Sequence, residues 1–285
     1  VTAADLKAHG AMASLLKEAM NPNLVQTIEH VPAFVHGGPF ANIAHGTNSL
    51  VATRAALKLA DYAVVEAGFA SDLGAEKFMD IACRYGQCSP SAVVLVTTVR
   101  ALELHGGAPK DQLGTPDPET LRKGLPNLEA HLDNLNNFGV PVVVALNRFT
   151  SDSDEELALV REAAASRDAR IALSEVWEKG GEGGMELARE VLAAMEQGAS
   201  YRRLYGEHLP LKDKIETIVT RVYGAEGVTF QPGAAAKLAE LADKVAPLPV
   251  ESLVKAHKMA FQDAETVAPA LMSAAQAARA LKVKE

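Results

Sequence analysis

Short apolar runs alternate with longer amphipathic stretches along roughly the first 200 residues of the chain. Each run is rich in valine, alanine, leucine or isoleucine at odd and even positions alike, and ends at a polar or glycine-containing turn. Strands that are apolar on both faces are typical of parallel sheets covered by helices. The pattern predicts four buried strands, at residues 62–66, 92–97, 140–146 and 169–173.

The stretches between and after these runs have the apolar spacing of helices. Within residues 118–138, for example, Leu121, Leu125, Leu128 and Leu132 recur at three- and four-residue intervals. Further helices are predicted at residues 42–60, 153–166, 211–223 and 232–245. The alternation of strands and helices predicts an α/β fold, with a parallel sheet that carries helices on both faces.

Strand signals fade after about Ser200, and from Glu251 the chain is rich in alanine and amphipathic. We therefore predict two parts: residues 1–200 form the α/β sheet domain that carries the ligand-binding strand ends, and residues 201–285 form a mostly helical C-terminal region.

The 285-residue chain is acidic, with 28 Lys and Arg against 36 Asp and Glu and a net charge of −8. Nucleic acids are bound through clustered Lys and Arg, so this charge argues against a nucleic-acid partner. No apolar stretch approaches the roughly 18 residues of a membrane span, and the first residues show no signal-peptide pattern. We expect a cytoplasmic protein in which Cys83 and Cys88 are reduced thiols, part of neither a disulfide nor a metal site.

Ligands of open parallel sheets bind beyond the carboxyl ends of the strands, so the residues there are candidates for chemistry. Glu66 ends the first predicted strand, and a glycine-containing loop with Asp72 follows it. A carboxylate at such a place can hold a metal or water, although solvated loop carboxylates are as common. Asn147 follows the third strand, and Ser174, with the adjacent Glu175, follows the fourth. Because an Asn amide both donates and accepts hydrogen bonds, these residues are candidates for reading a purine edge.

Two aromatic residues follow the same two strands. Phe149 comes shortly after the third strand, and Trp177, the only tryptophan, stands in a polar, glycine-flanked loop after the fourth. One interpretation is that both rings cap the edge of the core. The other is that they form a slot for a flat heterocycle, held by offset stacking.

The turn His36-Gly37-Gly38-Pro39 lies between a short predicted strand and a helix expected to begin near Asn42. A glycine-rich turn before a helix presents free N–H groups to an anion, although a tight structural turn with surface histidines gives the same sequence. No Gly-Lys dipeptide occurs in the chain, so the sequence contains no Walker A phosphate loop.

Several long motifs closely resemble those of formate–tetrahydrofolate ligase, also called formyltetrahydrofolate synthetase. They lie at residues 34–46, 66–69, 72–78, 99–102, 105–107, 174–177 and 179–184. The resemblance covers roughly Thr2 to Leu248, and we expect the family's pattern to stop there. It implies a P-loop-NTPase-like sheet and an ATP-driven condensation of formate with tetrahydrofolate, which passes through formyl phosphate to 10-formyltetrahydrofolate.

The resemblance also implies Mg²⁺ and a monovalent cation as cofactors, and a homo-oligomer, since bacterial members are usually tetramers. It assigns a folate-binding set (Phe149, Trp177, Pro39), a nucleotide-binding set (Asn147, Ser174, Glu175) and a catalytic set (His36, Gly37, Gly38, Asp72). The turn at His36 is expected to form part of the wall that faces the reacting phosphate.

The family's phosphate loop lies in its N-terminal half, which these residues do not match, so we expect this chain to correspond to the C-terminal half. Three hypotheses follow. The chain is active only together with an N-terminal half, as in a split enzyme. Alternatively, it is an inactive folate- or nucleotide-binding fragment. A third possibility is a structural subunit whose sheet edge pairs with a partner.

Overall fold

The computed structural model describes residues 2–38 and 46–244, which form two compact units. One unit comprises the described residues of Val1–Ala52 and Val65–Leu204, and the other comprises those of Thr53–Val64 and Tyr205–Glu285. The first unit contains the parallel sheet, and the second contains helices α9 (Leu211–Arg221) and α10 (Pro232–Lys244).

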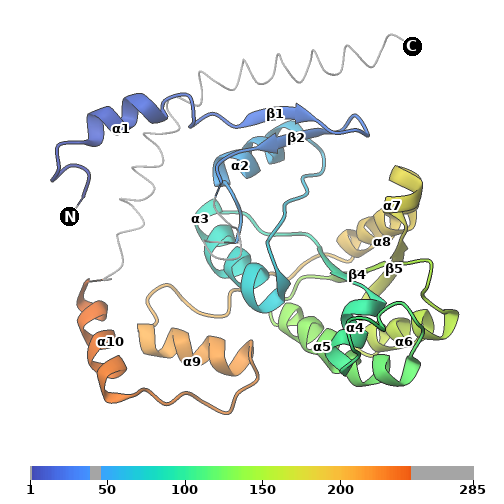
Figure 1. Cartoon of the computed structure of the whole chain (residues 1–285). Coiled ribbons are helices and arrows are strands. Elements are labelled where there is room, and N and C mark those ends of the chain that lie inside the picture. The colour runs from blue at the N-terminus through green and yellow to red at the C-terminus, as the bar shows by residue number, and fades with distance from the viewer. Residues whose placement is uncertain (1, 39–45, 245–285) are drawn as a thin grey trace, which may run out of the picture. The chain divides into compact units, whose positions relative to one another are not determined.

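Three parallel strands form the central sheet of the first unit (Figure 1). They are β3 (Val93–Thr97), β4 (Val142–Asn147) and β5 (Arg170–Ser174), in the order β3-β4-β5. Thr97 lies opposite Leu146, and Asn147 lies opposite Ser174, so the carboxyl ends of the strands meet at one edge. This confirms the parallel sheet and three of the four predicted strands, although β3 is not buried on both faces, since Val94 and Val96 are 41% and 59% exposed.

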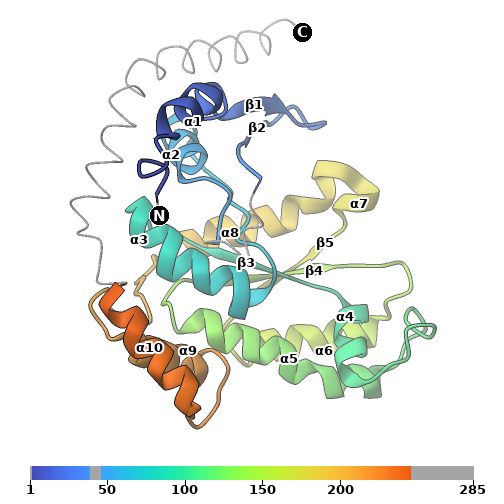
Figure 2. The same cartoon turned by 60° about the vertical axis from the view of Figure 1, so that its left-hand side comes forward.

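Helices lie on both faces of this sheet (Figure 2). On one face are α5 (Pro118–Asn136) and α6 (Asp154–Ala165), with α4 (Val99–Gly106) packed on α5, and on the other is α8 (Met185–Glu196). The central strand β4 is buried along nearly its whole length, as a strand covered on both faces must be.

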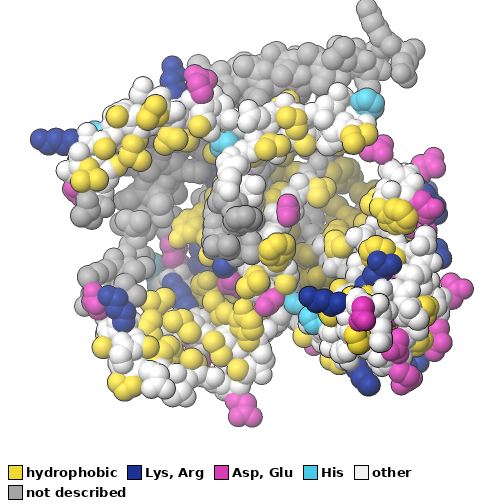
Figure 3. All heavy atoms as spheres, viewed as in Figure 1, with side chains coloured by type: hydrophobic (Ala, Val, Ile, Leu, Met, Phe, Trp, Pro, Cys, Tyr) yellow, Lys and Arg dark blue, Asp and Glu magenta, His cyan; other side chains and the backbone are white. Residues whose placement is uncertain are grey.

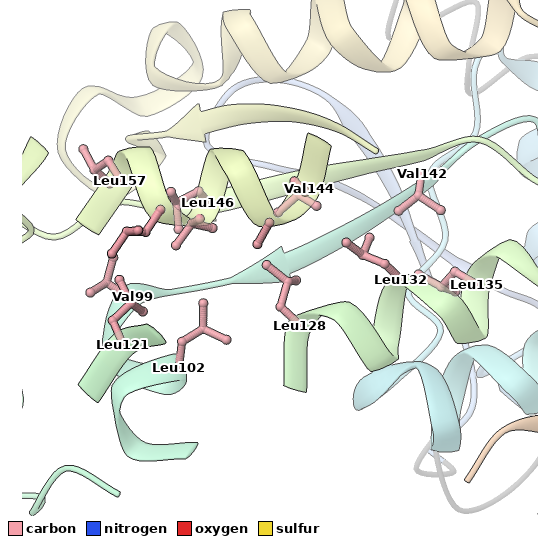
Figure 4. Packing of buried hydrophobic residues seen from close by; sticks show 14 residues of the cluster. Val99, Leu102, Leu121, Leu128, Leu132, Leu135, Val142, Val144, Leu146 and Leu157 are labelled. Carbon is pink, nitrogen blue, oxygen red and sulfur yellow. The ribbon is translucent and has the colours of Figure 1, made fainter. Parts of the chain in front are cut away.

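The hydrophobic core lies between β4 and the helices on one face (Figure 4). Leu128 and Leu132 of α5 meet Val142 and Val144 of β4, and all four side chains are at most 5% exposed. The leucine spacing that predicted α5 is thus the spacing of its buried face. Each fully buried leucine contributes about 1.5–3 kcal/mol relative to an exposed one.

A buried carboxylate ties together the N-termini of α5 and α6. Glu156 is 1% exposed, and its Oε2 accepts the main-chain N–H of Ser153 at 2.9 Å, which completes a capping box on α6. Its Oε1 accepts the N–H of Asp117, the N-cap of α5, at 2.8 Å. These bonds fix the chain segment that leaves β4 and enters α6.

The predicted strand at residues 62–66 is wrong: this segment has no regular secondary structure, and Val64 is 97% exposed. An apolar run becomes a strand only where a neighbour pairs with its backbone, and in the described part of the chain this run has no such neighbour. The structure instead adds an antiparallel hairpin, β1 (Asn23–Gln26) with β2 (Pro32–Val35), of which the sequence indicated only the second strand.

The predicted helix at residues 42–60 is shorter in the structure, where α2 spans Leu50–Leu59, and residues 42–45 lie outside the described residues. The predicted helices at 211–223 and 232–245 correspond to α9 and α10. The remaining helical segments are α1 (His9–Leu16), η1 (Ala70–Ala75), η2 (Phe78–Ala82), α3 (Cys83–Gly86), α7 (Val176–Lys179) and η3 (Gly180–Gly184). Among the helices described, none has the length and apolar character needed to cross a membrane.

The N-terminal segment exposes many apolar side chains (Figure 3). Leu6, Leu15, Ile28 and Val31 are each more than half exposed, and they come from the start of the chain, from α1 and from the turn of the β1–β2 hairpin. Exposed apolar side chains are common one at a time, but several in one segment are candidates for cover by another chain or segment.

Candidate functional site

The carboxyl edge of the sheet brings together two of the predicted site residues. Asn147 and Ser174 are register partners at the ends of β4 and β5, and the N–H of Arg148 donates to the Ser174 carbonyl at 3.1 Å. Ser174 is 4% exposed. Glu66, expected at the same edge, ends no strand and is exposed, because the run before it remains unpaired.

Phe149, in the turn after β4, is held at its backbone by hydrogen bonds and at its ring by a cation. The N–H of Phe149 donates to Oδ2 of Asp152 at 2.8 Å, and the N–H of Asp152 returns a bond to the Phe149 carbonyl at 3.1 Å. The guanidinium carbon of Arg100 lies 4.0 Å from the centre of the half-buried ring. Burial is the main cause that raises the pKa of the Asp152 carboxyl, partly offset by its bond from Phe149.

Trp177 lies beside this turn. Its indole Nε1 donates to the main-chain carbonyl of Arg148 at 2.9 Å, while 62% of the residue remains exposed. The sequence suggested a loop here, but Trp177 stands in the one-turn helix α7, which ends where Gly180 takes a φ of +58°. The only tryptophan is thus tethered next to Phe149 and still open to solvent.

The carboxylate of Glu175 forms ion pairs with two cationic side chains of this chain. It lies 2.6 Å from Nζ of Lys179 and 3.3 Å from the guanidinium of Arg148. The hydrogen bond from Lys179 is the main cause that lowers the pKa of this carboxyl. Glu175 therefore links α7 to the turn after β4.

The glycine-rich segment after α7 contacts the β1–β2 hairpin. The N–H of Gly181 donates to a carboxylate oxygen of Glu29, in the turn between the two strands, at 2.9 Å. The carbonyl of Gly183 accepts the N–H of Glu175 at 3.0 Å, and a side chain at Gly183 would collide with the Glu175 carbonyl. This close approach requires glycine at position 183.

The turn at His36 forms a second local group. Nε2 of His36 lies 2.9 Å from the carbonyl of Ala19, to which it donates, and in the neutral ring Nδ1 then accepts from the Ser49 hydroxyl at 2.6 Å. Gly37 has a φ of +69°, and a side chain at Gly38 would meet open space. Pro39 of the same motif lies outside the described residues, as does the helix start expected near Asn42.

Asp72 belongs to a third group, on η1 and α5. Its neighbour Ser71, which is 1% exposed, places its Oγ 2.6 Å from Nδ1 of His131 and accepts a bond from the Asn134 amide at 3.2 Å. Oδ1 of Asp72 lies 4.0 Å from the same ring nitrogen. Burial is the main cause that lowers the pKa of His131, and the charge of Asp72 opposes it.

Two buried carboxyls form a further cluster that the sequence did not indicate. Glu76 and Asp80 are 5% and 1% exposed, and each keeps one oxygen without a hydrogen-bond partner. Burial, and next the charge of Asp80, raise the pKa of Glu76 to about 7, while burial raises that of Asp80 to about 6. The second oxygen of Asp80 accepts the N–H of Leu204 at 2.9 Å.

Comparison with known protein families decides the identity of the chain. The family model for formate–tetrahydrofolate ligase matches residues 1–270. The chain belongs to the formate–tetrahydrofolate ligase family. The resemblance inferred from the motifs is thereby confirmed, and its expected end at Leu248 is corrected, since the match continues to residue 270.

Three residues at or near these sites make contacts that the sequence alone did not reveal. Arg100, within the motif at 99–102, stacks on Phe149, and Asp152 forms the turn that carries this ring. His131 gave no signal beyond a lone histidine on an otherwise leucine-rich helix. The contacts of Arg100 with Phe149 and of His131 with Ser71 join segments distant in sequence, which neither spacing nor composition can show.

The Mg²⁺ implied by the resemblance has no ready-made protein ligand set among the described residues. Among residues 2–38 and 46–244, no group of three or more His, Cys, Asp or Glu side chains is arranged to hold a metal ion. The carboxylate nearest to the strand-end site, Glu175, is engaged by Lys179 and Arg148. Because Mg²⁺ usually takes several of its ligands from water and from substrate phosphates, the Mg²⁺ of the family stays a prediction.

Proposed function

We propose that this chain binds tetrahydrofolate between Phe149 and Trp177, as part of a cytoplasmic, ATP-dependent formate–tetrahydrofolate ligase. The tether between the Trp177 indole and the Arg148 carbonyl carries the proposal, because it sets one exposed aromatic residue beside the turn that holds the other. The family match supports formate and tetrahydrofolate as the substrates.

The pterin ring of tetrahydrofolate is a flat heterocycle with polar edges. Aromatic side chains bind such rings by offset stacking, which contributes on the order of 1 kcal/mol beyond buried area. Trp177 offers an open ring, and its position is fixed by its own hydrogen bond and by Glu175, which joins α7 to Arg148. A slot whose walls are held before the ligand arrives loses less entropy on binding.

The proposed reaction has two steps. A formate oxygen attacks the terminal phosphorus of ATP, which gives formyl phosphate and ADP. The folate amine then attacks the formyl carbon, phosphate leaves, and 10-formyltetrahydrofolate forms. In this scheme the aromatic slot orients the folate amine, Asn147 and Ser174 contact the adenine, and His36, Gly37 and Gly38 face the reacting phosphate.

His36 serves this scheme as a positioning residue, because both ring nitrogens are engaged by Ala19 and Ser49. We propose a catalytic role for Asp72, with His131 beside it; burial lowers the pKa of His131 and so favours its neutral form. The P-loop-like character of the sheet also belongs to the proposal.

We propose that the phosphate cradle comes from another chain or segment, a proposal supported by the lack of a Gly-Lys dipeptide in this sequence. That observation favours a second candidate function, a folate-binding module that is inactive alone. The exposed apolar side chains of the N-terminal segment supply a surface for a partner. We propose that a further copy of the chain, or the half with the phosphate loop, covers them.

Titration with tetrahydrofolate tests the folate slot directly. Trp177 is the only tryptophan, so its emission reports on this position without background. We expect the emission to change until it saturates. Phe149→Ala should raise the tetrahydrofolate concentration at the midpoint several-fold. Phe230→Ala is the matched control, because this ring also faces a cation, Lys212, but lies in the second unit. An unchanged emission at millimolar folate, in a chain folded by circular dichroism, would rule the slot out.

A further inference from the structure

The side chain of Arg100 covers one face of the Phe149 ring. Its guanidinium carbon lies 4.0 Å from the ring centre, within the range of a cation–π interaction, and its Nη2 donates to the Ser151 hydroxyl at 3.2 Å. Arg100 stands in the first turn of α4, directly after β3, whereas Phe149 and Ser151 follow β4. The contact therefore joins the carboxyl ends of two neighbouring strands.

The surroundings of Arg100 differ from those of an arginine in a simple ion pair. Its buried Nε has no hydrogen-bond partner, and its charge acts on Asp152, whose carboxylate accepts the N–H of Phe149 instead. Asp152 thus holds the backbone of Phe149 while Arg100 holds the ring. The two contacts leave Phe149 little freedom to turn about its side-chain bonds.

A phenylalanine ring has two faces, and a guanidinium on one of them leaves the other for a ligand. We propose that Arg100 is a positioning residue for folate: it supports the rear face of Phe149, so that the front face is presented to the pterin opposite Trp177. This inference rests on the proposed folate slot and extends it to a residue on a third segment. Ser151 steers the guanidinium over the ring through its hydroxyl.

The planar shape of the guanidinium matters as much as its charge. Arginine stacks flat on an aromatic face, whereas the ammonium of lysine is a compact, strongly hydrated point charge. Arg100→Lys keeps the charge and removes the plane, and Arg100→Gln removes the charge. If Arg100 supports the ring, the Arg100→Lys variant should recover only part of the tetrahydrofolate affinity that Arg100→Gln loses.

Tetrahydrofolate binding by the full chain, followed through Trp177 emission, tests the inference. We expect Arg100→Gln to raise the dissociation constant by about three- to tenfold, in line with one cation–π contact. The dissociation constant of Arg100→Lys should lie between that of Arg100→Gln and that of the wild type. Arg122→Gln, which removes a half-exposed arginine paired with Glu119, is the control and should leave binding unchanged.

A double-mutant cycle separates support of the ring from a general structural role. In a Phe149→Leu background no ring remains to be held, so Arg100→Gln should then change the dissociation constant by less than twofold. An equal loss in both backgrounds would overturn the inference, as would tighter binding by Arg100→Gln, which would mean that the guanidinium occupies the place of the pterin. If the wild type binds tetrahydrofolate and Phe149→Ala weakens binding while Arg100→Gln does not, the folate slot is supported and the role of Arg100 is refuted. If the wild type does not bind, both fall.

Discussion

The indole N–H of Trp177 donates to the carbonyl of Arg148, the residue before Phe149, at 2.9 Å. One hydrogen bond therefore couples the two aromatic residues that follow adjacent strands. The ion pairs of Glu175 with Arg148 and Lys179 join the same two segments. The proposed folate slot is thus held by contacts within this chain, and its two walls can be varied separately.

Trp177→Ala should weaken tetrahydrofolate binding by several-fold or more, because it removes one stacking surface and the tether to Arg148 together. Trp177→Phe keeps a ring without the indole donor, so its loss should be smaller. Isothermal titration calorimetry is the suitable measurement, since both variants lack the only tryptophan. Equal affinities for wild type and Trp177→Ala would contradict the stacking role.

The 285-residue chain alone should form no 10-formyltetrahydrofolate from formate, ATP and tetrahydrofolate. Phosphoryl transfer depends on main-chain N–H groups and a lysine placed around the terminal phosphate, and the sequence has no Gly-Lys loop to supply them. A chromatographic assay for the product checks this, with a complete ligase of the family as the positive control. Turnover by the chain, purified from a host without its own ligase, would refute the expectation.

The sequence predicted those elements whose signal is local. The apolar runs that became β3, β4 and β5 found neighbours to pair with, although Val94 and Val96 leave one face of β3 exposed. The leucine spacing of α5 marks the face that this helix buries. Residues 62–66 carry the same local signal, but no described segment pairs with them, so the prediction of a strand there was wrong. Strand formation depends on partners that a local pattern cannot reveal.

In the candidate site, too, the sequence predicted what depends on local position and not what depends on tertiary contacts. Parallel strands bring their carboxyl ends to one edge, which is why Asn147 and Ser174 could be paired from their positions in sequence. The stacking of Arg100 on Phe149 depends on side-chain directions set by tertiary packing, and no spacing rule gives it. The folate and nucleotide roles of these residues stay predictions.

Leu132→Ala should lower the free energy of unfolding by about 2–5 kcal/mol, because it leaves a cavity between α5 and β4 where the wild-type side chain is fully buried. Leu15→Ala, at a position that is 84% exposed on α1, is the matched control and should change stability by less than about 0.5 kcal/mol. Urea denaturation followed by circular dichroism measures both. A small effect of Leu132→Ala would mean that the core in Figure 4 is loosely packed.

The buried pair Glu76 and Asp80 should make stability depend on pH. Burial and the neighbouring carboxyl raise the pKa of Glu76 from an ordinary 4.5 to about 7 in the folded protein. Between these two values the folded protein keeps a proton that the unfolded chain releases. The free energy of unfolding should therefore be highest at low pH within this window and fall as pH rises, by up to about 1.4 kcal/mol per pH unit for each such proton.

Glu76→Gln isolates this effect, because glutamine is neutral at every pH and retains the shape of the protonated side chain. Denaturation at several pH values between 5 and 8 should give a shallower decline for the variant than for the wild type, and the variant should be the more stable of the two at pH 8. Glu119→Gln, whose side chain is 83% exposed, should reproduce the wild-type slope. Identical slopes for wild type and Glu76→Gln would show that Glu76 is already ionised in the folded protein at pH 5, with a partner that offsets its burial.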